Sequence, residues 1–357
     1  MVDNLSSLIF YIFIFITSAF FVGLNKKSYY YAWIGVSIIV ILAAFRGPVG
    51  TDYFTYMNQF ERIKISNWPS VINVSNLSNE LLFLILMKIT SYSSQVLFLG
   101  GAAVISLGTI YTVLNKQYVA INIGVAYLFY LLVYFPSSLN VIRQYIALSI
   151  TLYSLKFVFE KNLGKYLFGV LIAFLFHKSA IVTLPIYLLW SKKNKAIITG
   201  YKLGIILSII LFVVLNYQMI INYFAAFDAF ERYAVYSSVS DVGKNRDFYL
   251  RVFNFTTILA LRKRLMAKDN RNGLFIVMLL ISLLIGITGF WHPQVKRLSL
   301  YFELPLIILM GYIPSLFSKQ YKLVVSLIII LYAIVYFVIT YFILGSGNIF
   351  PYIFLAR

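Results

Sequence analysis

Cysteine is absent from this chain, and two other chemically versatile residue types are scarce. The 357 residues include no cysteine, two histidines and 11 acidic residues. The lack of cysteine excludes disulfides, thiolate nucleophiles and cysteine-ligated metals. With so few histidines and acids, we expect neither a dedicated metal cage nor a bound cofactor. Basic and aromatic side chains are plentiful by contrast, with 30 lysines and arginines and 29 tyrosines.

Charged residues are also scarce relative to apolar ones. They make up 11% of the chain against 61% hydrophobic residues, and the mean hydropathy is +0.88. Soluble domains carry about 25% charged residues, whereas repeated apolar runs of roughly 17–25 residues are typical of membrane-spanning helices. The short alternating segments of a membrane barrel are absent. We therefore predict an all-α polytopic membrane protein, formed as a single integral membrane domain over residues 1–357.

The apolar runs predict about twelve transmembrane helices, within a range of about 10 to 13. The expected spans are residues 6–23, 29–45, 95–114, 119–135, 142–159, 164–176, 178–190, 197–217, 247–262, 273–290, 297–317 and 322–344. Segments 164–176 and 178–190 are short for full spans. Segment 80–91 is too short for roughly 30 Å of hydrocarbon, so we interpret it as an interfacial helix on the outer side.

Clusters of lysine and arginine predict the orientation, because short loops rich in them are expected to be cytoplasmic. With twelve spans, all of these clusters fall on one side: Lys26 and Lys27; Lys116; Lys161 and Lys165; Lys192, Lys193 and Lys195; Arg262, Lys263, Arg264, Lys268 and Arg271; Lys319 and Lys322. The outer side then carries two larger loops, at about 46–94 and about 218–246. Much of the net charge of +19 belongs to the inner loops, so nucleic-acid binding is not indicated.

Other basic residues fall on the predicted outer side, beginning with the stretch AAFRGPVGTDYFTYMNQF at 43–60. Arg46 ends the second span, and the following glycines and proline predict a turn. Beyond Asp52, the residues Tyr53, Tyr56 and Phe60 recur at helical spacing. One interpretation is the rim of an outer-facing site. The alternative is an interfacial arginine beside a belt of tyrosines, with an amphipathic surface helix behind it.

Two further motifs place basic residues at helix ends on the same side. In SLNVIRQYIALSI (138–150), Arg143 and Gln144 lie in the first turns of a helix. An arginine there can bind phosphate through two hydrogen bonds, or it can pair with an acid elsewhere in the bundle. In FLFHKSAIVTLP (174–185), His177 and Lys178 interrupt two apolar runs. His177 can act as acid or base or bind phosphate or sugar, or it can simply hydrogen-bond to a neighbouring helix.

The last two motifs combine arginine with tyrosine. In FERYAVY (230–236), Arg232 and Tyr236 fit one side of a short helix, which on pattern alone is equally typical of a solvated amphipathic helix. In WHPQVKRLSLYFELP (291–305), Arg297 and Tyr301 are four residues apart and are expected to share a helix side. Glu303 lies within a predicted span, so we expect it to be paired or functional.

Taken together, the arginine-bearing motifs converge on one predicted membrane side and are interleaved with tyrosines. Arginines suit a pyrophosphate, and tyrosine rings suit sugars. The residues therefore indicate a site for an anionic, lipid-linked, carbohydrate-like molecule. On this evidence, an enzyme and a transporter for that ligand look alike.

The same motifs resemble those of the EpsG-like branch of the Wzy-type polysaccharide polymerases. In the order of that family they are Arg46 with GTDYFTY (50–56), the glutamate of NELLF (79–83), NVIRQYIAL (140–148), FHKSA (176–180), FERYAVY (230–236) and RLSLYF (297–302). The resemblance implies a GT-C-like, metal-independent glycosyltransferase in the bacterial inner membrane, with its active site facing the periplasm or exterior. It would polymerise undecaprenyl-pyrophosphate-linked oligosaccharide units into O-antigen, capsule or exopolysaccharide. A copolymerase that regulates chain length is the implied partner.

Under this resemblance, arginines neutralise the charge that develops on the departing pyrophosphate. The catalytic candidates are Asp52, Arg143, His177 and Arg297. We expect Asp52 to contact the acceptor and His177 to handle phosphate or a proton. The substrate-binding candidates are Arg46, Tyr53, Tyr56, Glu80, Gln144, Lys178, Arg232, Tyr236 and Tyr301.

Three other functions fit the composition less well. A flippase or exporter of lipid-linked oligosaccharide is expected to carry charges along the midplane of several helices, and often internal repeats. A polysaccharide acyltransferase would use a catalytic histidine, for which His177 is available, but the arginines would then have no role. A non-catalytic assembly or regulatory subunit would tolerate loss of the arginine motifs.

Overall fold

The computed structural model describes residues 3–26, 28–74, 80–117, 121–191, 196–197, 200–216, 246–290 and 293–355. Over these ranges the chain is helical except for loops and one antiparallel pair of two-residue strands, β1 (Trp190–Ser191) and β2 (Ala196–Ile197). Five helical segments in the described residues are long and apolar enough to cross a membrane: Asn4–Gly23, Gln95–Lys116, Asn272–Phe290, Arg297–Leu316 and Lys322–Ile343. Shorter apolar helices accompany them. The prediction of an all-α polytopic membrane protein is confirmed.

The helices gather into two compact units, each assembled from segments that are distant in sequence. The first unit comprises Met1–Tyr153, Leu171–Lys178 and Met310–Arg357, and the second comprises Ser154–Val170 and Ser179–Leu309. Each unit is described separately below. The single membrane domain expected from the sequence stays a prediction.

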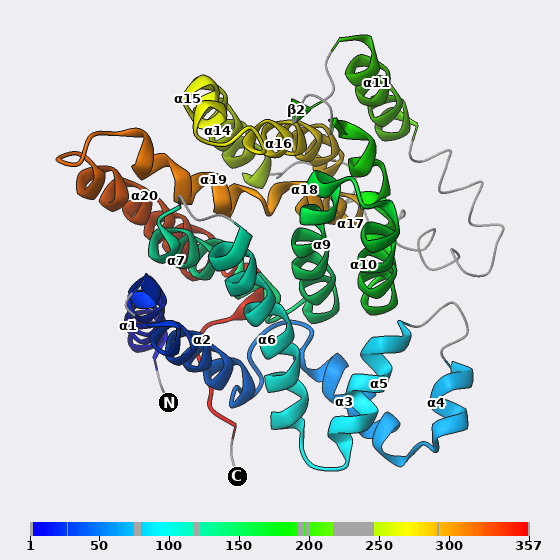
Figure 1. Cartoon of the computed structure of the whole chain (residues 1–357). Helices are drawn as coiled ribbons and strands as arrows, with labels where there is room; N and C mark the ends of the chain where they lie inside the picture. Colours follow the sequence, from blue (N-terminus) through cyan, green and yellow to red (C-terminus); the bar gives the residue numbers. More distant parts are fainter. Residues whose placement is uncertain are drawn as a thin grey trace. The chain divides into compact units, whose positions relative to one another are not determined.

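Apolar helices form the body of the first unit (Figure 1). They are α1 (Asn4–Gly23), α2 (Tyr29–Ala44), α6 (Gln95–Thr112), α7 (Ile123–Val133) and α20 (Lys322–Phe337). Helix α1 packs against α2 and α7, α2 packs against α6, and α7 packs against α20. Small residues allow the closest approach, as is common between membrane helices: the Ser18 hydroxyl donates to the Gly35 carbonyl at 2.7 Å, and a Cβ at Gly35 would lie 2.5 Å from the Ser18 carbonyl oxygen.

Short helices α3 (Tyr53–Ile65), α4 (Trp68–Val74) and α5 (Leu81–Ser91) follow α2. Helix α3 buries the side formed by Tyr53, Tyr56, Phe60 and Ile63, as its spacing predicts. In α5, buried Lys88 directs its ammonium group at the backbone carbonyls that end α3, those of Ile63, Lys64 and Ser66, at 3.3, 3.2 and 2.6 Å. A lysine at a helix C-terminus satisfies carbonyls that have no partner within the helix. The charge in this short apolar segment thus joins α5 to α3.

Three further elements of the chain carry or border the candidate site: α8 (Phe135–Ser138), α9 (Ile142–Glu160) and α10 (Leu163–Phe176). After α10 the chain forms a 3₁₀ helix, η3 (Lys178–Leu189), with Pro185 inside it. A 3₁₀ helix rises about 2.0 Å per residue against about 1.5 Å for an α-helix, so this short segment covers more depth than its length suggests. Helical turns η1 (Leu24–Lys26), η2 (Val113–Gln117), η7 (Val338–Ile343) and η8 (Ser346–Asn348) complete the first unit.

The second unit is arranged around α16 (Asn272–Gly286), which packs against α11, α14, α15 and α18. Besides β1, β2 and parts of α9, α10 and η3, the described residues of this unit form α11 (Tyr201–Leu215), α14 (Arg246–Ala260), α15 (Arg262–Lys268), η4 (Ile287–Phe290), α17 (Pro293–Lys296), η5 (Arg297–Ser299) and α18 (Leu300–Glu303). Helices α19 (Leu306–Tyr312) and η6 (Ile313–Leu316) lead back to the first unit. The span expected at 297–317 is therefore interrupted at Pro305, which lacks a backbone N–H.

Candidate functional site

A buried carboxylate in the first unit joins two of the predicted site residues. One oxygen of Glu80 lies 2.5 Å from Nη1 of Arg143, and the other lies 2.5 Å from Nδ1 of His177. The Glu80 side chain is 8% exposed, whereas the side chains of Arg143 and His177 are 37% and 23% exposed. The buried Glu80 thus contacts both Arg143 and His177, and these two side chains reach the surface of the unit.

Each of these three residues stands at the end of a helix. Glu80 immediately precedes α5, and its carbonyl accepts the N–H groups of Phe83 and Leu84 at 3.1 Å. Arg143 is the second residue of α9. His177 follows α10 and donates its backbone N–H to Ala173 at 2.8 Å. Because helix ends interrupt the apolar runs, polar side chains can be placed there without lying along a lipid-facing helix surface.

The surroundings of Glu80 favour its ionised form. Burial by itself raises the pKa of a carboxyl group. The hydrogen bond from His177, the charges of His177 and Arg143, and the backbone N–H of Lys178 together outweigh burial and hold the pKa of Glu80 below its usual value. Glu80 is therefore a fixed negative charge at neutral pH, and it orients both of its partners.

Aromatic rings line one side of the Arg143 guanidinium. Its central carbon lies 5.8 Å from the ring centroid of Tyr56 and 5.6 Å from that of Phe83. The two rings are themselves 5.7 Å apart, edge to face. Burial raises the pKa of Tyr56, although the charge of Arg143 opposes that rise, so its hydroxyl is neutral and can donate. Tyr56 also shares a side-chain hydrogen bond with Arg143, so this hydrogen bond and the two aromatic rings together hold the guanidinium in place.

The arrangement has two chemical capacities. A guanidinium carries five N–H donors in a planar fork, so Arg143 can hold Glu80 through Nη1 and present other donors to an anion. With Glu80 ionised, the favoured tautomer of His177 donates from Nδ1 and leaves the lone pair on Nε2. Nε2 can then accept a proton from a hydroxyl group, and the carboxylate stabilises the imidazolium that results.

Arg46 lies in the interior of the first unit and not at a surface rim. It is 2% exposed, because the C-terminal segment of the chain covers it through a β-bridge between Arg46 and Phe354. Burial lowers the pKa of Arg46 to about 10, while the hydroxyls of Tyr11, Tyr56 and Tyr53 oppose that shift. Arg46 therefore remains charged at neutral pH. Its position next to a folded-back chain end was not evident from local sequence.

A cavity of about 20 Å³ adjoins Arg46. Polar Ser106, Ser138 and Tyr145 lie among its mainly apolar lining residues. Two guanidinium nitrogens of Arg46, Nε and Nη1, are buried and make no hydrogen bond to the residues that the structure describes. A cavity of this size holds about one water molecule, so a phosphate group does not fit there in this conformation.

The other predicted residues of the first unit surround the two arginines. Asp52 is half-buried, precedes α3, and accepts a hydrogen bond from the Thr51 hydroxyl at 3.1 Å. Tyr53 is buried beside Arg46. Gln144 is buried in α9, directly after Arg143. Lys178 is half-buried, and its backbone N–H points to Glu80.

Arg297 and Tyr301 belong to the second unit. Arg297 is exposed and opens the 3₁₀ turn Arg297–Ser299, whereas Tyr301 is buried in α18 with its hydroxyl 3.0 Å from that of Ser179. The shared helix side expected for the two residues stays a prediction.

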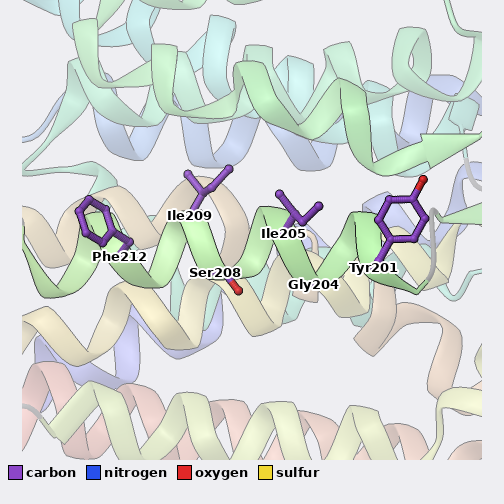
Figure 2. A pocket seen from close by; sticks show the side chains of 6 residues that line it. All are labelled: Tyr201, Gly204, Ile205, Ser208, Ile209 and Phe212. Carbon is purple, nitrogen blue, oxygen red and sulfur yellow. The ribbon is translucent and has the colours of Figure 1, made fainter.

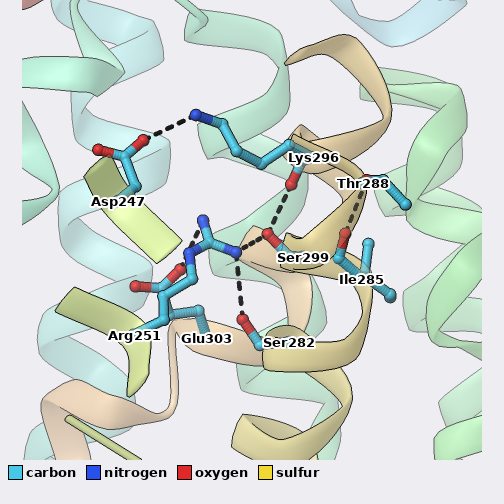
Figure 3. Close-up of polar contacts among 8 residues, drawn as sticks. All are labelled: Asp247, Arg251, Ser282, Ile285, Thr288, Lys296, Ser299 and Glu303. Atoms are coloured by element: carbon cyan, nitrogen blue, oxygen red, sulfur yellow. Dashed lines mark hydrogen bonds and ion pairs between the residues drawn. The ribbon is translucent and has the colours of Figure 1, made fainter. Parts of the chain in front are cut away.

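The second unit also contains a charged cluster that the sequence analysis missed (Figure 3). Arg251 pairs with Glu303 at 2.9 Å, and its Nη1 contacts the hydroxyls of Ser299 and Ser282. Lys296 donates to Asp247 at 2.8 Å. The pairing expected for Glu303 is confirmed. Asp247 and Arg251 are four residues apart within an expected span, and that spacing of opposite charges was a usable signal.

A shallow apolar surface on α11 offers little chemistry. Figure 2 shows Tyr201, Ile205, Ile209 and Phe212 projecting from one side of this single helix. Such a surface is typical of lipid contact. Two further predicted residues, Arg232 and Tyr236, lie outside the described residues, as does most of the expected loop at 218–246. Among the described residues no group of three or more histidines or acids could hold a metal ion.

Comparison with known proteins identifies the family. The EpsG family model matches residues 29–354, which include every residue of the cluster around Glu80. The chain therefore belongs to the EpsG family, a family of polysaccharide-related membrane proteins. No curated protein and no solved structure matches the chain.

Proposed function

We propose that this protein polymerises undecaprenyl-pyrophosphate-linked oligosaccharide units on the outer face of the bacterial inner membrane. Its membership of the EpsG family and its apolar helices support a membrane enzyme of polysaccharide synthesis. The observation that carries the proposal is the bridging of Arg143 and His177 by one buried carboxylate, Glu80. An anion-binding group and a candidate base are thereby fixed side by side.

The reaction assigns one role to each member of the cluster. A hydroxyl at the non-reducing end of the incoming unit attacks C1 of the sugar that is linked to undecaprenyl pyrophosphate. The new C1–O bond forms as the bond from C1 to the pyrophosphate oxygen breaks, and the pyrophosphate lipid departs with the electron pair. Nε2 of His177 takes the hydroxyl proton, and Arg143 stabilises the negative charge that develops on the leaving group. Glu80 stabilises the imidazolium ion.

A purely structural ion pair is the competing interpretation of Arg143 and Glu80. A structural ion pair accounts for the short contact between Arg143 and Glu80. It does not account for His177 as a second partner of Glu80, or for the exposure of the Arg143 side chain. A structural pair is most stable when both charges are enclosed and fully hydrogen-bonded, yet more than a third of the Arg143 side chain is exposed.

Several other predicted residues keep their proposed roles. Asp52 and Tyr56 lie on the same unit and are proposed to contact the acceptor or donor sugars. Arg297, exposed on the second unit, is proposed to bind pyrophosphate. Lys178 at the start of η3 and Gln144 in α9 are proposed to bind substrate next to His177 and Arg143. A copolymerase that sets chain length remains the proposed partner, and we expect the reaction to need no metal ion.

Reconstitution with the lipid-linked repeat units of the native host tests the function directly. Wild-type protein is expected to give a ladder of polymer on a gel, and the ladder should persist with a chelator. His177→Asn places an amide near the position of Nδ1, so contact with Glu80 can persist while the base is lost; it should abolish the ladder. Lys64→Ala is the matched control. Lys64 is exposed on α3, and its ion pair with Glu61 is long, at 4.0 Å, and exposed to solvent.

Three results would count against the proposal. Folded wild-type protein that makes no ladder from authentic substrate would exclude polymerisation. If the same protein moved the lipid across the liposome membrane, the flippase interpretation would replace the polymerase proposal. A full ladder from His177→Asn would retain a polymerase but remove His177 as its base.

A further inference from the structure

Asn140 makes an unusual set of contacts between α8 and α9. It is buried, and its Oδ1 accepts the backbone N–H of Thr51 at 2.6 Å and the Thr51 hydroxyl at 3.1 Å. Its Nδ2 donates to the carbonyl of Gly347 at 3.1 Å. One side chain thus joins three segments: the loop after α2, the start of α9 and the C-terminal region.

The C-terminal region is hydrogen-bonded to the loop after α2 at three points. We call residues 345–355 the C-terminal strap. Its Asn348 and Ile353 carbonyls accept the N–H groups of Gly50 and Gly47 at 3.0 and 2.7 Å, and the N–H of Leu355 donates to Phe45 at 2.8 Å. The loop that carries Arg46 and leads to Asp52 is therefore paired with the chain end.

The strap is itself fixed to the long helices of the first unit. The hydroxyl of Tyr352 donates to the Leu42 carbonyl at 2.8 Å, and the Tyr352 N–H donates to the Ser7 hydroxyl at 3.0 Å. The hydroxyl of Tyr11 donates to the carbonyl of Ile349 at 3.1 Å. The strap is consequently anchored to α1 and α2, and Asn140 transmits that anchorage to α9.

Two glycines lie directly against the Asn140 side chain. Gly50 has φ +101°, and a Cβ there would lie 2.6 Å from Oδ1 of Asn140. Gly347 has φ +76°, and a Cβ there would lie 2.5 Å from Nδ2. Both the left-handed backbone and the lack of a side chain are needed at these positions. Backbone on both sides is thus fitted to a single amide.

We infer that Asn140 is a positioning residue for the reaction proposed above, on which this inference rests. Thr51 immediately precedes Asp52 and α3, which carries Tyr56 against Arg143. Asn140 lies three residues before Arg143. The hydrogen bonds of Asn140 therefore fix the position of Asp52 and Tyr56 relative to the guanidinium of Arg143. Displacement of reacting groups by about 1 Å can lower a rate about 10²-fold.

Two glycine variants distinguish the effect of disturbing the Asn140 contacts from the effect of backbone strain alone. Gly347→Ala brings a Cβ into Nδ2 of Asn140, whereas Gly345→Ala meets nothing within 4 Å although Gly345 also has a left-handed φ of +64°. Polymerisation by Gly347→Ala is expected to fall about tenfold in kcat relative to Gly345→Ala, with KM for the lipid-linked acceptor changed less than about twofold. Asn140→Ala is expected to lower kcat similarly.

The double variant Asn140→Ala/Gly347→Ala provides a coupling test. Without the Asn140 amide the new Cβ has no clash, so the second change should add only the effect that Gly345→Ala shows in the wild type. Hydrogen exchange at the amide of Thr51 should rise in both single variants, because the Thr51 N–H loses or shifts its acceptor. Asn140→Asp keeps that acceptor and should retain more activity than Asn140→Ala.

The outcomes distinguish this inference from the proposed function. If Arg143→Ala abolishes the ladder but Asn140→Ala keeps full kcat, the polymerase site stands and the positioning role is overturned. Additive effects of Asn140→Ala and Gly347→Ala, or losses that match the loss of folded protein, would also overturn it. If wild-type protein makes no polymer, the proposed function fails and the inference fails with it.

Discussion

Glu80 in the first unit and Glu303 in the second are each paired with an arginine, but their surroundings differ. Arg143 beside Glu80 is more than a third exposed and has a histidine as its neighbour. Arg251 and Glu303 are 8% and 12% exposed, and the hydroxyls of Ser282 and Ser299 surround the guanidinium. The same two charged groups thus occupy an open setting in one unit and an enclosed setting in the other.

The difference indicates what each pair does. An enclosed pair has little access to a ligand, and its serines supply hydrogen bonds that offset the cost of removing charge from water. An open pair gains less from its own attraction, because solvent screens it. Its arginine can instead bind an anion and its histidine can accept a proton. We therefore propose a structural role for the enclosed cluster and a role in the reaction for the open cluster.

Breaking the enclosed pair tests the structural half of this comparison and has the largest expected effect. Arg251→Ala leaves Glu303 as an uncompensated buried charge, so the free energy of unfolding should fall by about 3–5 kcal/mol. Arg251→Met/Glu303→Met removes both charges and should recover most of that loss. Denaturant unfolding in detergent gives both values. A double variant as unstable as Arg251→Ala would show that the charges themselves are required.

Removing the open arginine tests the chemical half. Arg143→Ala should lower the polymerisation rate about 10²–10³-fold, the usual cost of losing one group that stabilises transition-state charge. Arg143→Lys should recover only part, because an ammonium lacks the planar fork of a guanidinium. Rates of ladder formation provide the measurement, with Arg62→Ala on the exposed side of α3 as control. Equal losses for Arg62 and Arg143 would remove the distinction between the sites.

Sequence alone predicted those features that depend on local pattern. The buried side of α3 followed from helical spacing, and the pairing of Glu303 followed from the cost of charge within an apolar helix. The 3₁₀ turn at Arg297–Ser299 could not be predicted this way, because α and 3₁₀ spacings differ only slightly over a few residues.

The grouping of the candidate site depends on contacts between distant parts of the chain. Glu80 lies 63 residues from Arg143 and 97 residues from His177, so all three were candidates without a known geometry. On sequence alone we assign Asp52 to the acceptor and Glu80 to substrate binding, and the role of each stays a prediction. The burial of Arg46 depends on a strap from the far end of the chain, for which local sequence carries no signal.

Acid should weaken the open cluster in a way that isolates Glu80. The folded protein holds the pKa of Glu80 below its ordinary value of 4.5, so the unfolded chain binds a proton more readily. The stabilisation is therefore present above about pH 4.5 and is lost as pH falls through the folded pKa. Glu80→Gln should remove this part of the acid dependence. Unfolding of both proteins between pH 3 and 6, a range chosen around the ordinary carboxyl pKa, measures it; parallel curves would contradict the prediction.

The smallest expected effect concerns Ser282, at the edge of the enclosed cluster. Its hydroxyl lies 3.4 Å from Nη1 of Arg251, near the outer limit of a hydrogen bond, so Ser282→Ala should lower the free energy of unfolding by only about 0.5–1 kcal/mol. Polymerisation should be unchanged, since nothing in the enclosed cluster is assigned to substrate. A rate loss without a stability loss would mean that this cluster takes part in the reaction, and the contrast between enclosed structure and open chemistry would then fail.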